Sequence, residues 1–170
     1  MNEINLSDLE LKTFTEQDVL DYCQINNINP LYIIELNLNW NKLTDISGIK
    51  LFKNLKELYL SHNELKDISV LKLFKNLKIL TLIENKIEDI LVLKYLNNLK
   101  ELNIGNNKVK DIQIVKYLKK LIYLGIINLG LESDQYKYIN SLKNLNVLYH
   151  YKEFKNKNIL NQLNKNIKLL

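Results

Sequence analysis

Four consecutive stretches of the chain repeat one pattern: IIELNLNWNKLTDISGIKLFKN (residues 33–54), LKELYLSHNELKDISVLKLFKN (55–76), LKILTLIENKIEDILVLKYLNN (77–98) and LKELNIGNNKVKDIQIVKYLKK (99–120). Each is 22 residues long, and no insertion separates them. They share L-x-x-L-x-L-x-x-N-x-L/I/V-x-D-I, with Ile33 in the first slot. Residues 121–144 form a fifth turn of 24 residues that lacks the asparagine, and a partial sixth turn begins at Leu145. Such repetition predicts a solenoid, in which each turn buries its apolar side against its neighbours.

The spacing within one turn predicts the fold class, an α/β solenoid with the horseshoe architecture of leucine-rich repeats. The L-x-L pair predicts a short parallel strand on the concave side, with the leucines pointing into the core. The apolar-periodic segment after each Asp-Ile predicts a short helical or 3₁₀ segment on the convex side. We expect one continuous domain with an N-terminal helical cap (1–32), five repeats (33–144), and a partial repeat with a C-terminal helical cap (145–170).

Sequence signals at both ends predict these caps. Thr15-Glu16-Gln17-Asp18 resembles a capping box at the start of a helix over roughly residues 16–27, and Phe14 and Val19 are spaced as a hydrophobic staple. We expect Pro30 to help end this helix. The residues expected to face the first turn are Val19, Leu20, Cys23 and Ile28. The residues expected on one face of the C-terminal helix are Ile159, Leu160, Leu163 and Ile167.

Two polar columns recur at the repeat interval, and we expect both to be structural. Asn41, Asn63, Asn85 and Asn107 form a ladder whose side chains turn inward to bond backbone groups left unpaired by the bend. Aspartates stand four residues later, where we expect them to cap the convex segments: Asp45, Asp67, Asp89 and Asp111. The D-x-D spacing of calcium loops is absent, so we expect no metal.

Composition narrows the function classes. The chain has a net charge of +5 but contains no arginine, the residue best suited to reading phosphate or guanine by paired hydrogen bonds. It also contains no alanine, and its excess of Asn, Lys and Ile resembles the product of an AT-rich genome. A single cysteine, Cys23, excludes an internal disulfide, and we read it as a buried core thiol. Together with an opening segment that does not resemble a signal peptide, this predicts a cytoplasmic protein, with export by a signal-independent route left open.

The outward strand positions and the residues just after each strand form the candidate partner-binding surface. The first four turns place glutamates and no lysine there, beside the only tryptophan. Aromatic and isoleucine side chains ringed by polar groups are typical of protein-binding hot spots, although they are also good strand formers. The residues expected to bind a partner are Glu35, Asn37, Trp40, Glu57, Tyr59, His62, Ile79, Thr81, Ile83, Glu84, Glu101, Asn103, Tyr123 and Ile127. The partner would be a protein with a basic or mixed apolar surface, and a homodimer is a further possibility.

The convex side offers an alternative. Lys50, Lys72, Lys94 and Lys116 recur at the repeat interval, with Lys53, Lys75 and Lys119 beside them. This ridge is either a solvated face or an anion-binding strip for RNA, an acidic protein tail or a lipid surface. We expect no aromatic residues interleaved with it, and nucleic acid is therefore the less favoured partner.

No constellation of residues points to catalysis. The two histidines, His62 and His150, lie about four turns apart. H-E-x-x-H, C-x-x-C, P-loop and G-x-G-x-x-G motifs are absent, so we expect neither an enzyme nor a cofactor.

The 22-residue turn with N-x-I/L-x-D-I followed by L-x-x-L resembles the leucine-rich-repeat subfamily named for the regulator of type-one protein phosphatase, and bacterial internalins are similar. In that family the concave strands and the residues just after them bind other proteins. The resemblance implies the same use here for Glu35, Asn37, Trp40, Glu57, Tyr59, Ile79, Thr81, Ile83, Glu84, Glu101 and Asn103. The present array is much shorter than the phosphatase regulator, and the internalin signal peptide and surface anchor are not found in it. Fold alone does not fix the partner.

Overall fold

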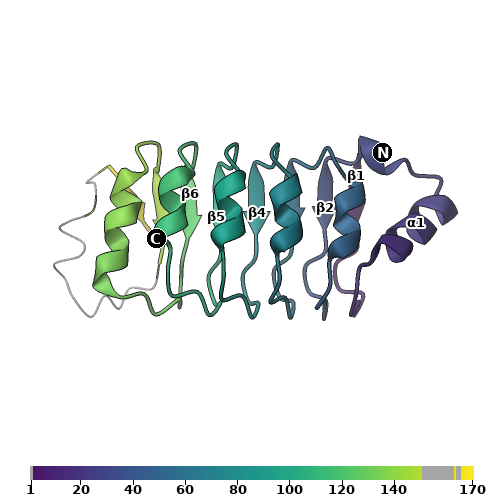
Figure 1. Cartoon of the computed structure of the whole chain (residues 1–170), viewed down its shortest axis with the longest axis horizontal. Coiled ribbons are helices and arrows are strands. Elements are labelled where there is room, and N and C mark those ends of the chain that lie inside the picture. The colour runs from purple at the N-terminus through teal and green to yellow at the C-terminus, as the bar shows by residue number, and fades with distance from the viewer. Residues whose placement is uncertain (1, 151–162, 164–165) are drawn as a thin grey trace.

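The computed structural model describes residues 2–150, 163 and 166–170. Within this part of the chain, one strand from each turn joins an eight-stranded parallel sheet whose strand order follows the chain (Figure 1). The strands are β1 (Glu3–Asn5), β2 (Glu35–Asn37), β3 (Glu57–Tyr59), β4 (Ile79–Thr81), β5 (Glu101–Asn103), β6 (Tyr123–Gly125), β7 (Val147–Tyr149) and β8 (Lys168–Leu169). The solenoid and its leucine-rich-repeat architecture are thus as predicted.

Helical segments form the second layer, on the convex side that faces the viewer in Figure 1. They are the α-helix α1 (Glu16–Ile25) and the 3₁₀ helices η1 (Pro30–Tyr32), η2 (Ser47–Leu51), η3 (Ser69–Leu73), η4 (Leu91–Tyr95), η5 (Gln113–Tyr117) and η6 (Ser133–Ser141). The helix of the 24-residue turn, η6, is the longest of the 3₁₀ helices described.

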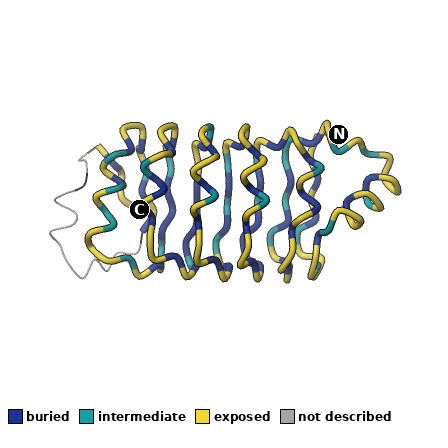
Figure 2. The backbone as a smooth tube through the Cα atoms, in the orientation of Figure 1, coloured by how far each residue is buried: buried dark blue, intermediate teal, exposed yellow. Residues whose placement is uncertain are grey.

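The core lies between the two layers and repeats from turn to turn (Figure 2). In the turn that contains β3, the pattern leucines Leu55, Leu58, Leu60 and Leu65 are all fully buried. Each such side chain contributes about 1.5–3 kcal/mol by leaving water. At the N-terminal end, Phe14 stacks on Phe52 with ring centroids 6.3 Å apart, which ties the cap to the first turn.

The asparagine ladder has the predicted role. The buried Asn85 side chain donates from Nδ2 to the carbonyl oxygens of Leu60 and Leu82, at 2.9 and 3.1 Å. Its Oδ1 accepts the backbone N–H of Leu65 at 3.0 Å. Asn41, Asn63 and Asn107 bond equivalent groups. Each amide therefore joins its own turn to the preceding one.

Each aspartate of the second column stands one residue before the N-cap of a convex helix, not at the N-cap as predicted. The residue at the N-cap of η3 is Ile68, and Asp67 precedes it. The Asp67 carboxylate accepts the backbone N–H of Ser69 at 2.7 Å, and Asp45, Asp89 and Asp111 form the same turn. The carboxylate thus satisfies the first helical N–H from outside the helix.

The N-terminal cap contains the predicted helix and capping box: Thr15 Oγ1 accepts the N–H of Asp18, and Asp18 accepts the N–H of Thr15. Two details were wrong. Leu20 is exposed, because the short helix docks through the narrow stripe of Val19 and Cys23. The helix also ends at Ile25, well before Pro30, and Pro30 instead begins η1.

Strands at both ends of the sheet were not predicted. Strand β1 pairs with β2 and so extends the sheet into the cap, with Ile4 in register with Leu36. Strand β8 pairs with β7 at the other end. Of the residues expected on a C-terminal helical face, Ile159 and Leu160 lie outside the described residues. Leu163 and Ile167 are buried, and Ile167 directly precedes β8.

Candidate functional site

Strand pairing in register sorts the outward concave side chains into columns. The first residues of the strands form one column, which begins Glu3, Glu35, Glu57 and continues with Ile79 and Glu101. The third residues form a second column, in which Asn37, Tyr59 and Thr81 are neighbours. The concave face therefore presents rows of side chains at the separation of parallel strands, about 4.8 Å.

Three carboxylates from neighbouring strands stand in the first column. Burial, together with the negative charges of Glu3 and Glu57 on either side, raises the pKa of the Glu35 carboxyl. Sequence reasoning missed Glu3, although Glu3-Ile4-Asn5-Leu6 matches the Glu35-Leu36-Asn37-Leu38 of the first repeat. The acidic column is thus longer than predicted, and its charges repel one another.

Tyr59 links the two columns. Its hydroxyl donates a hydrogen bond to Oε2 of Glu57 at 2.7 Å. Burial and this carboxylate both raise the pKa of the Tyr59 phenol, so the group stays a neutral donor. The bond also fixes the Tyr59 ring over the face.

A third row follows the strands and has an unusual backbone. Trp40, His62, Glu84, Asn106 and Asn128 all have positive φ, between 52° and 57°. This left-handed conformation is routine for Asn but costs Trp, His or Glu about 1–2 kcal/mol. We call these five residues the left-handed row.

Side-chain contacts connect the left-handed row from end to end. The Trp40 and His62 rings stack with centroids 3.5 Å apart and an interplanar angle of 8°. His62 Nδ1 lies 2.9 Å from Oε2 of Glu84, and Glu84 Oε1 accepts from the Asn106 amide at 3.4 Å. The Asn128 amide in turn donates to Asn106 at 2.7 Å. The row is therefore held in one arrangement, with the Trp40 side chain 60% exposed at its end.

One predicted contact residue is not available on the surface. Asn103 is only 8% exposed. Its side chain lies over Gly125 of the next turn, in the space that a Cβ there would fill, and its Oδ1 accepts the N–H of Gly105 at 3.2 Å. The expectation that Asn103 faces a partner was wrong, because the neighbouring glycine gives its side chain room to fold down.

The remaining predicted residues reach the face but do not form one apolar strip. Ile79 lies between Glu57 and Glu101 in the first column, and Tyr59 lies between Asn37 and Thr81 in the second. Ile83, Tyr123 and Ile127 are partly buried. The structure thus intersperses apolar side chains with acidic ones.

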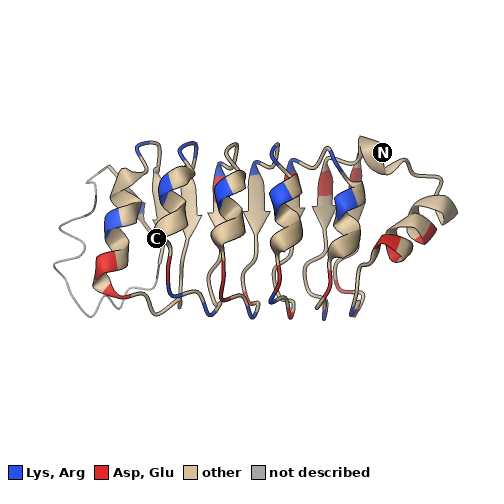
Figure 3. Ribbon diagram, in the orientation of Figure 1, with Lys and Arg blue, Asp and Glu red and all other residues tan. Residues whose placement is uncertain are grey.

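Three of the four convex lysines have a charged or aromatic side chain beside them. Lys50 is paired with Glu16 of α1. The ammonium groups of Lys94 and Lys116 lie 5.2 and 5.1 Å from the ring centroids of the adjacent tyrosines, Tyr95 and Tyr117. Aromatic residues therefore do accompany these lysines, contrary to prediction. Figure 3 also shows acidic residues at the N-terminal ends of the same helices.

The described residues contain neither a group of side chains that could hold a metal ion nor a helix that could span a membrane. No three of their His, Cys, Asp or Glu side chains are grouped so that they could hold a metal ion. Burial raises the pKa of the Cys23 thiol, as expected for a core residue. None of the described helices is long and apolar enough to cross a bilayer.

Comparison with known proteins agrees with this fold. A family model described as "Leucine Rich repeats (2 copies)" matches residues 33–73 and 53–95, and one described as "Leucine Rich repeat" matches residues 95–112. No curated protein matches the sequence. The chain is a leucine-rich-repeat protein.

Solved structures similar to this chain include bacterial repeat proteins. An internalin (inlF) from Listeria monocytogenes has a TM-score of 0.72 at 27% identity, and the match covers 97% of this chain and 57% of the internalin chain. A leucine-rich-repeat protein from Leptospira interrogans has a TM-score of 0.72 at 27% identity, and the match covers 98% of this chain and 41% of the Leptospira chain. Internalin C2 from L. monocytogenes, at 24% identity and a TM-score of 0.63, shares the fold. This chain thus spans about half the length of the first two.

Proposed function

We propose that this protein is a protein-binding module whose concave face holds a partner segment with both basic and apolar side chains. The observation that carries the proposal is the column of Glu3, Glu35 and Glu57, whose like charges lie on adjacent strands with no lysine among them. A cationic side chain of a partner would relieve this repulsion. Electrostatic complementarity of this kind increases specificity and association rate.

The left-handed row supplies the second part of the proposed interface. Among the described residues of this face, Trp40 is the most exposed aromatic one, and its stacking on His62 orders it before any partner arrives. A preordered aromatic anchor costs less entropy on binding, and tryptophan is enriched in hot spots. Glu84 lies beside the pair and offers a carboxylate to a lysine or arginine of the partner.

The likeness to internalins and other repeat proteins supports a binding role. We propose an intracellular adaptor or inhibitor, because an open face that presents side chains in rows favours a partner surface over an enclosed substrate. The intracellular location rests on the single buried cysteine. A second copy of this chain remains an alternative occupant of the face, and light scattering across protein concentrations distinguishes the two.

Site-specific photocrosslinking in native cells tests the proposal. A photoreactive amino acid replaces exposed Glu101 on the concave face or, as a matched control, exposed Leu91 on the convex face. We expect the concave probe to crosslink a defined protein that the convex probe does not. Equal capture from both faces, or capture from the convex face alone, would contradict the proposal.

A further inference from the structure

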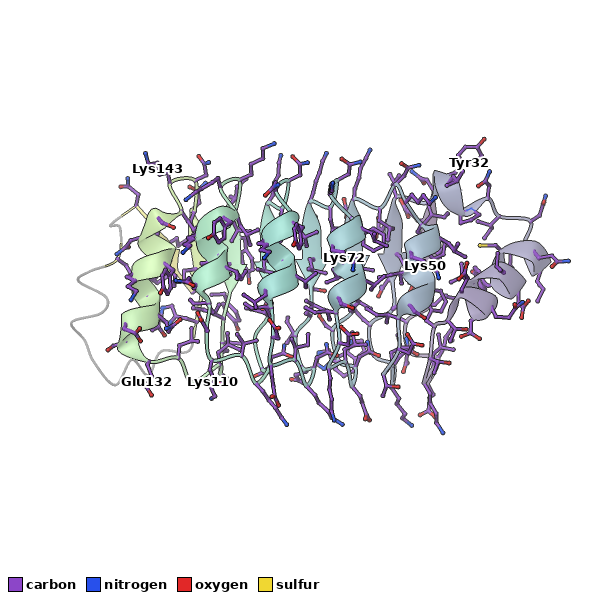
Figure 4. The ribbon with its side chains drawn as sticks, in the orientation of Figure 1. Tyr32, Lys50, Lys72, Lys110, Glu132 and Lys143 are labelled. Carbon is purple, nitrogen blue, oxygen red and sulfur yellow. The ribbon has the colours of Figure 1, made fainter. Side chains whose placement is uncertain are left out.

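The two long edges of the solenoid carry very different charge. We call residues 53–56, 75–78, 97–100, 119–122 and 143–146 the lysine edge, where each convex helix returns to the next strand. These segments read KNLK, KNLK, NNLK, KKLI and KNLN, without a single Asp or Glu. Their lysines are Lys53, Lys56, Lys75, Lys78, Lys100, Lys119, Lys120 and Lys143. In Figures 3 and 4 this edge runs along the top of the view, between the labelled Tyr32 and Lys143.

The opposite edge, where each strand leads to its convex helix, serves as an internal comparison. Its segments 42–45, 64–67, 86–89 and 108–111 read KLTD, ELKD, KIED and KVKD, so that each contains both acidic and basic residues. Salt bridges join Lys42 to Glu10 and Lys86 to Glu64, at 3.0 and 2.8 Å. A bias toward lysine codons acts on both edges alike, so it does not explain why only one lacks acids.

No salt bridge within the described residues involves a lysine of the lysine edge. The amide side chains between them are used structurally: Asn54 donates to the carbonyl oxygen of Leu31 at 2.7 Å, and Asn98 donates to that of Lys75 at 2.9 Å. These bonds hold successive turns together and fix the spacing of the edge. Lys120 donates from Nζ to Oδ1 of Asn98 at 2.7 Å, and all the lysines of the edge are exposed on this ordered frame.

A shallow groove of about 590 Å³ follows this edge across neighbouring turns. Leu31 and Tyr32 line one end of it, and Asn54, Lys56, Asn76 and Lys78 line its length. Tyr32 is 70% exposed. The groove thus combines repeated positive charge with an exposed aromatic ring at one end.

We propose that the lysine edge binds single-stranded nucleic acid through its phosphate backbone, without sequence preference. Positive grooves that follow the backbone, with aromatic rings for stacking bases, are the common means of such binding. Lysine acts as a point charge, and without arginine the edge lacks the paired donors that read guanine. An acidic peptide without aromatic residues has no aromatic ring to stack on Tyr32, and a phosphatidylserine headgroup has none either.

Fluorescence anisotropy with labelled oligo(dT) and oligo(U) of about 12 nucleotides tests this assignment, since such sites cover about 4–16 nucleotides. We expect the wild-type protein to bind both, and log K to fall with log[salt] by about 0.7 per phosphate contacted. Absence of binding at about 50 mM salt would overturn the proposal.

Two variants with the same net charge distinguish an effect of where the lysines lie from an effect of the total charge. The lysine-edge variant carries Lys53→Gln, Lys56→Gln, Lys75→Gln and Lys78→Gln. The control carries Lys42→Gln, Lys66→Gln, Lys108→Gln and Lys110→Gln on the opposite edge. Each lowers the net charge from +5 to +1, a change of four charges. We expect the first to bind at least tenfold more weakly with a shallower salt slope, and the second to stay within twofold of wild type. Equal losses would contradict the assigned site.

Further measurements identify the ligand class and separate this proposal from the protein-binding function. Tyr32→Ala should weaken binding at least about fivefold, as expected for the loss of one stacked base. No loss in Tyr32→Ala, or tighter binding to polyglutamate or phosphatidylserine vesicles than to the oligonucleotides, would overturn the assignment to nucleic acid. Ile83→Ala on the concave face should bind oligonucleotide like wild type, which keeps this test independent of the proposed protein-binding function.

Discussion

At the scale of single residues, the strongest constraints are the positions that join one turn to the next. Asn85 bonds the backbone of two turns, and the left-handed row connects side chains over five. The sequence predicted the ladder because asparagine recurs there with little variation. It could not predict the contacts between Trp40, His62 and Glu84, because these three residues differ in type although they occupy equivalent positions. Only the structure shows that they share the left-handed backbone conformation.

Removal of one ladder amide should destabilise the whole array. Asn85→Ala leaves buried backbone groups without partners, and we expect a loss of about 1–3 kcal/mol in the free energy of unfolding. Exposed Asn76 is the matched control, and Asn76→Ala should change stability by less than about 0.5 kcal/mol. Urea denaturation measures both. A ladder variant as stable as the control would refute the structural assignment of this column.

Glu35 should show a trade-off between stability and binding. Its raised pKa means that the folded state disfavours the charged form, so ionised Glu35 lowers stability at neutral pH, and stability is regained as pH falls through the raised pKa. Glu35→Gln should therefore raise the melting temperature slightly, by about 1 °C, with the difference vanishing at acidic pH. The same variant should bind a basic partner more weakly.

Calorimetric scans across pH and titrations with the partner measure the two effects of Glu35→Gln. An unchanged melting temperature would argue against repulsion within the column. Unchanged affinity would remove Glu35 from the interface.

At the scale of elements, the repeats were predictable and the ends were only partly so. The capping box gave the start of α1, but β1 was missed because its segment matches only half of a repeat turn. Asn103 shows a second limit: its burial depends on Gly125 in the next turn, a contact that no pattern within one turn reveals. Local spacing therefore predicts each turn well, and contacts between unlike turns poorly.

The capping box at α1 predicts a pH dependence. Hydrogen bonds from the backbone N–H and the hydroxyl of Thr15 lower the pKa of Asp18 below its usual 3.8. The ionised group therefore contributes stability above pH 3.8, and this contribution is lost as pH falls through the lowered pKa. At neutral pH, Asp18→Ala should cost about 1 kcal/mol.

Urea titrations of wild type and Asp18→Ala at a series of pH values measure this difference, which should close in strong acid. Asp21→Ala, on the same helix but without a backbone hydrogen bond to its carboxylate, is the control. A gap between wild type and Asp18→Ala that stays constant with pH would show that the carboxylate charge is not involved.

At the scale of the whole molecule, the solenoid displays three surfaces of distinct character. The concave face is acidic and partly apolar. One edge is rich in lysine, and the opposite edge carries both charges (Figure 3). A net charge of +5 hides this separation. The sequence alone indicated the acidic face but assigned the basic surface to the convex helices, because a linear repeat does not show which lysines lie beyond the helix ends.

Charge separation on this scale predicts a salt-dependent stability. The lysine-edge variant with four Lys→Gln changes should unfold at a higher temperature than wild type in low salt, because like charges along the edge no longer repel. The gain should shrink toward zero at about 1 M salt, where the Debye length is about 3 Å. Thermal unfolding at several salt concentrations measures it. A lysine-edge variant less stable than wild type in low salt would show that the lysines support the fold.

The central claim, that the concave face binds a protein, is tested most directly by calorimetric titration of the crosslinked partner. The variants are Trp40→Ala, Tyr59→Ala and Ile83→Ala, with Tyr117→Ala on the convex face as the control. We expect each concave variant to bind more than tenfold more weakly, since truncating a hot-spot anchor typically costs about 2 kcal/mol or more, and the control to bind normally. Wild-type affinity in all three concave variants would contradict the account.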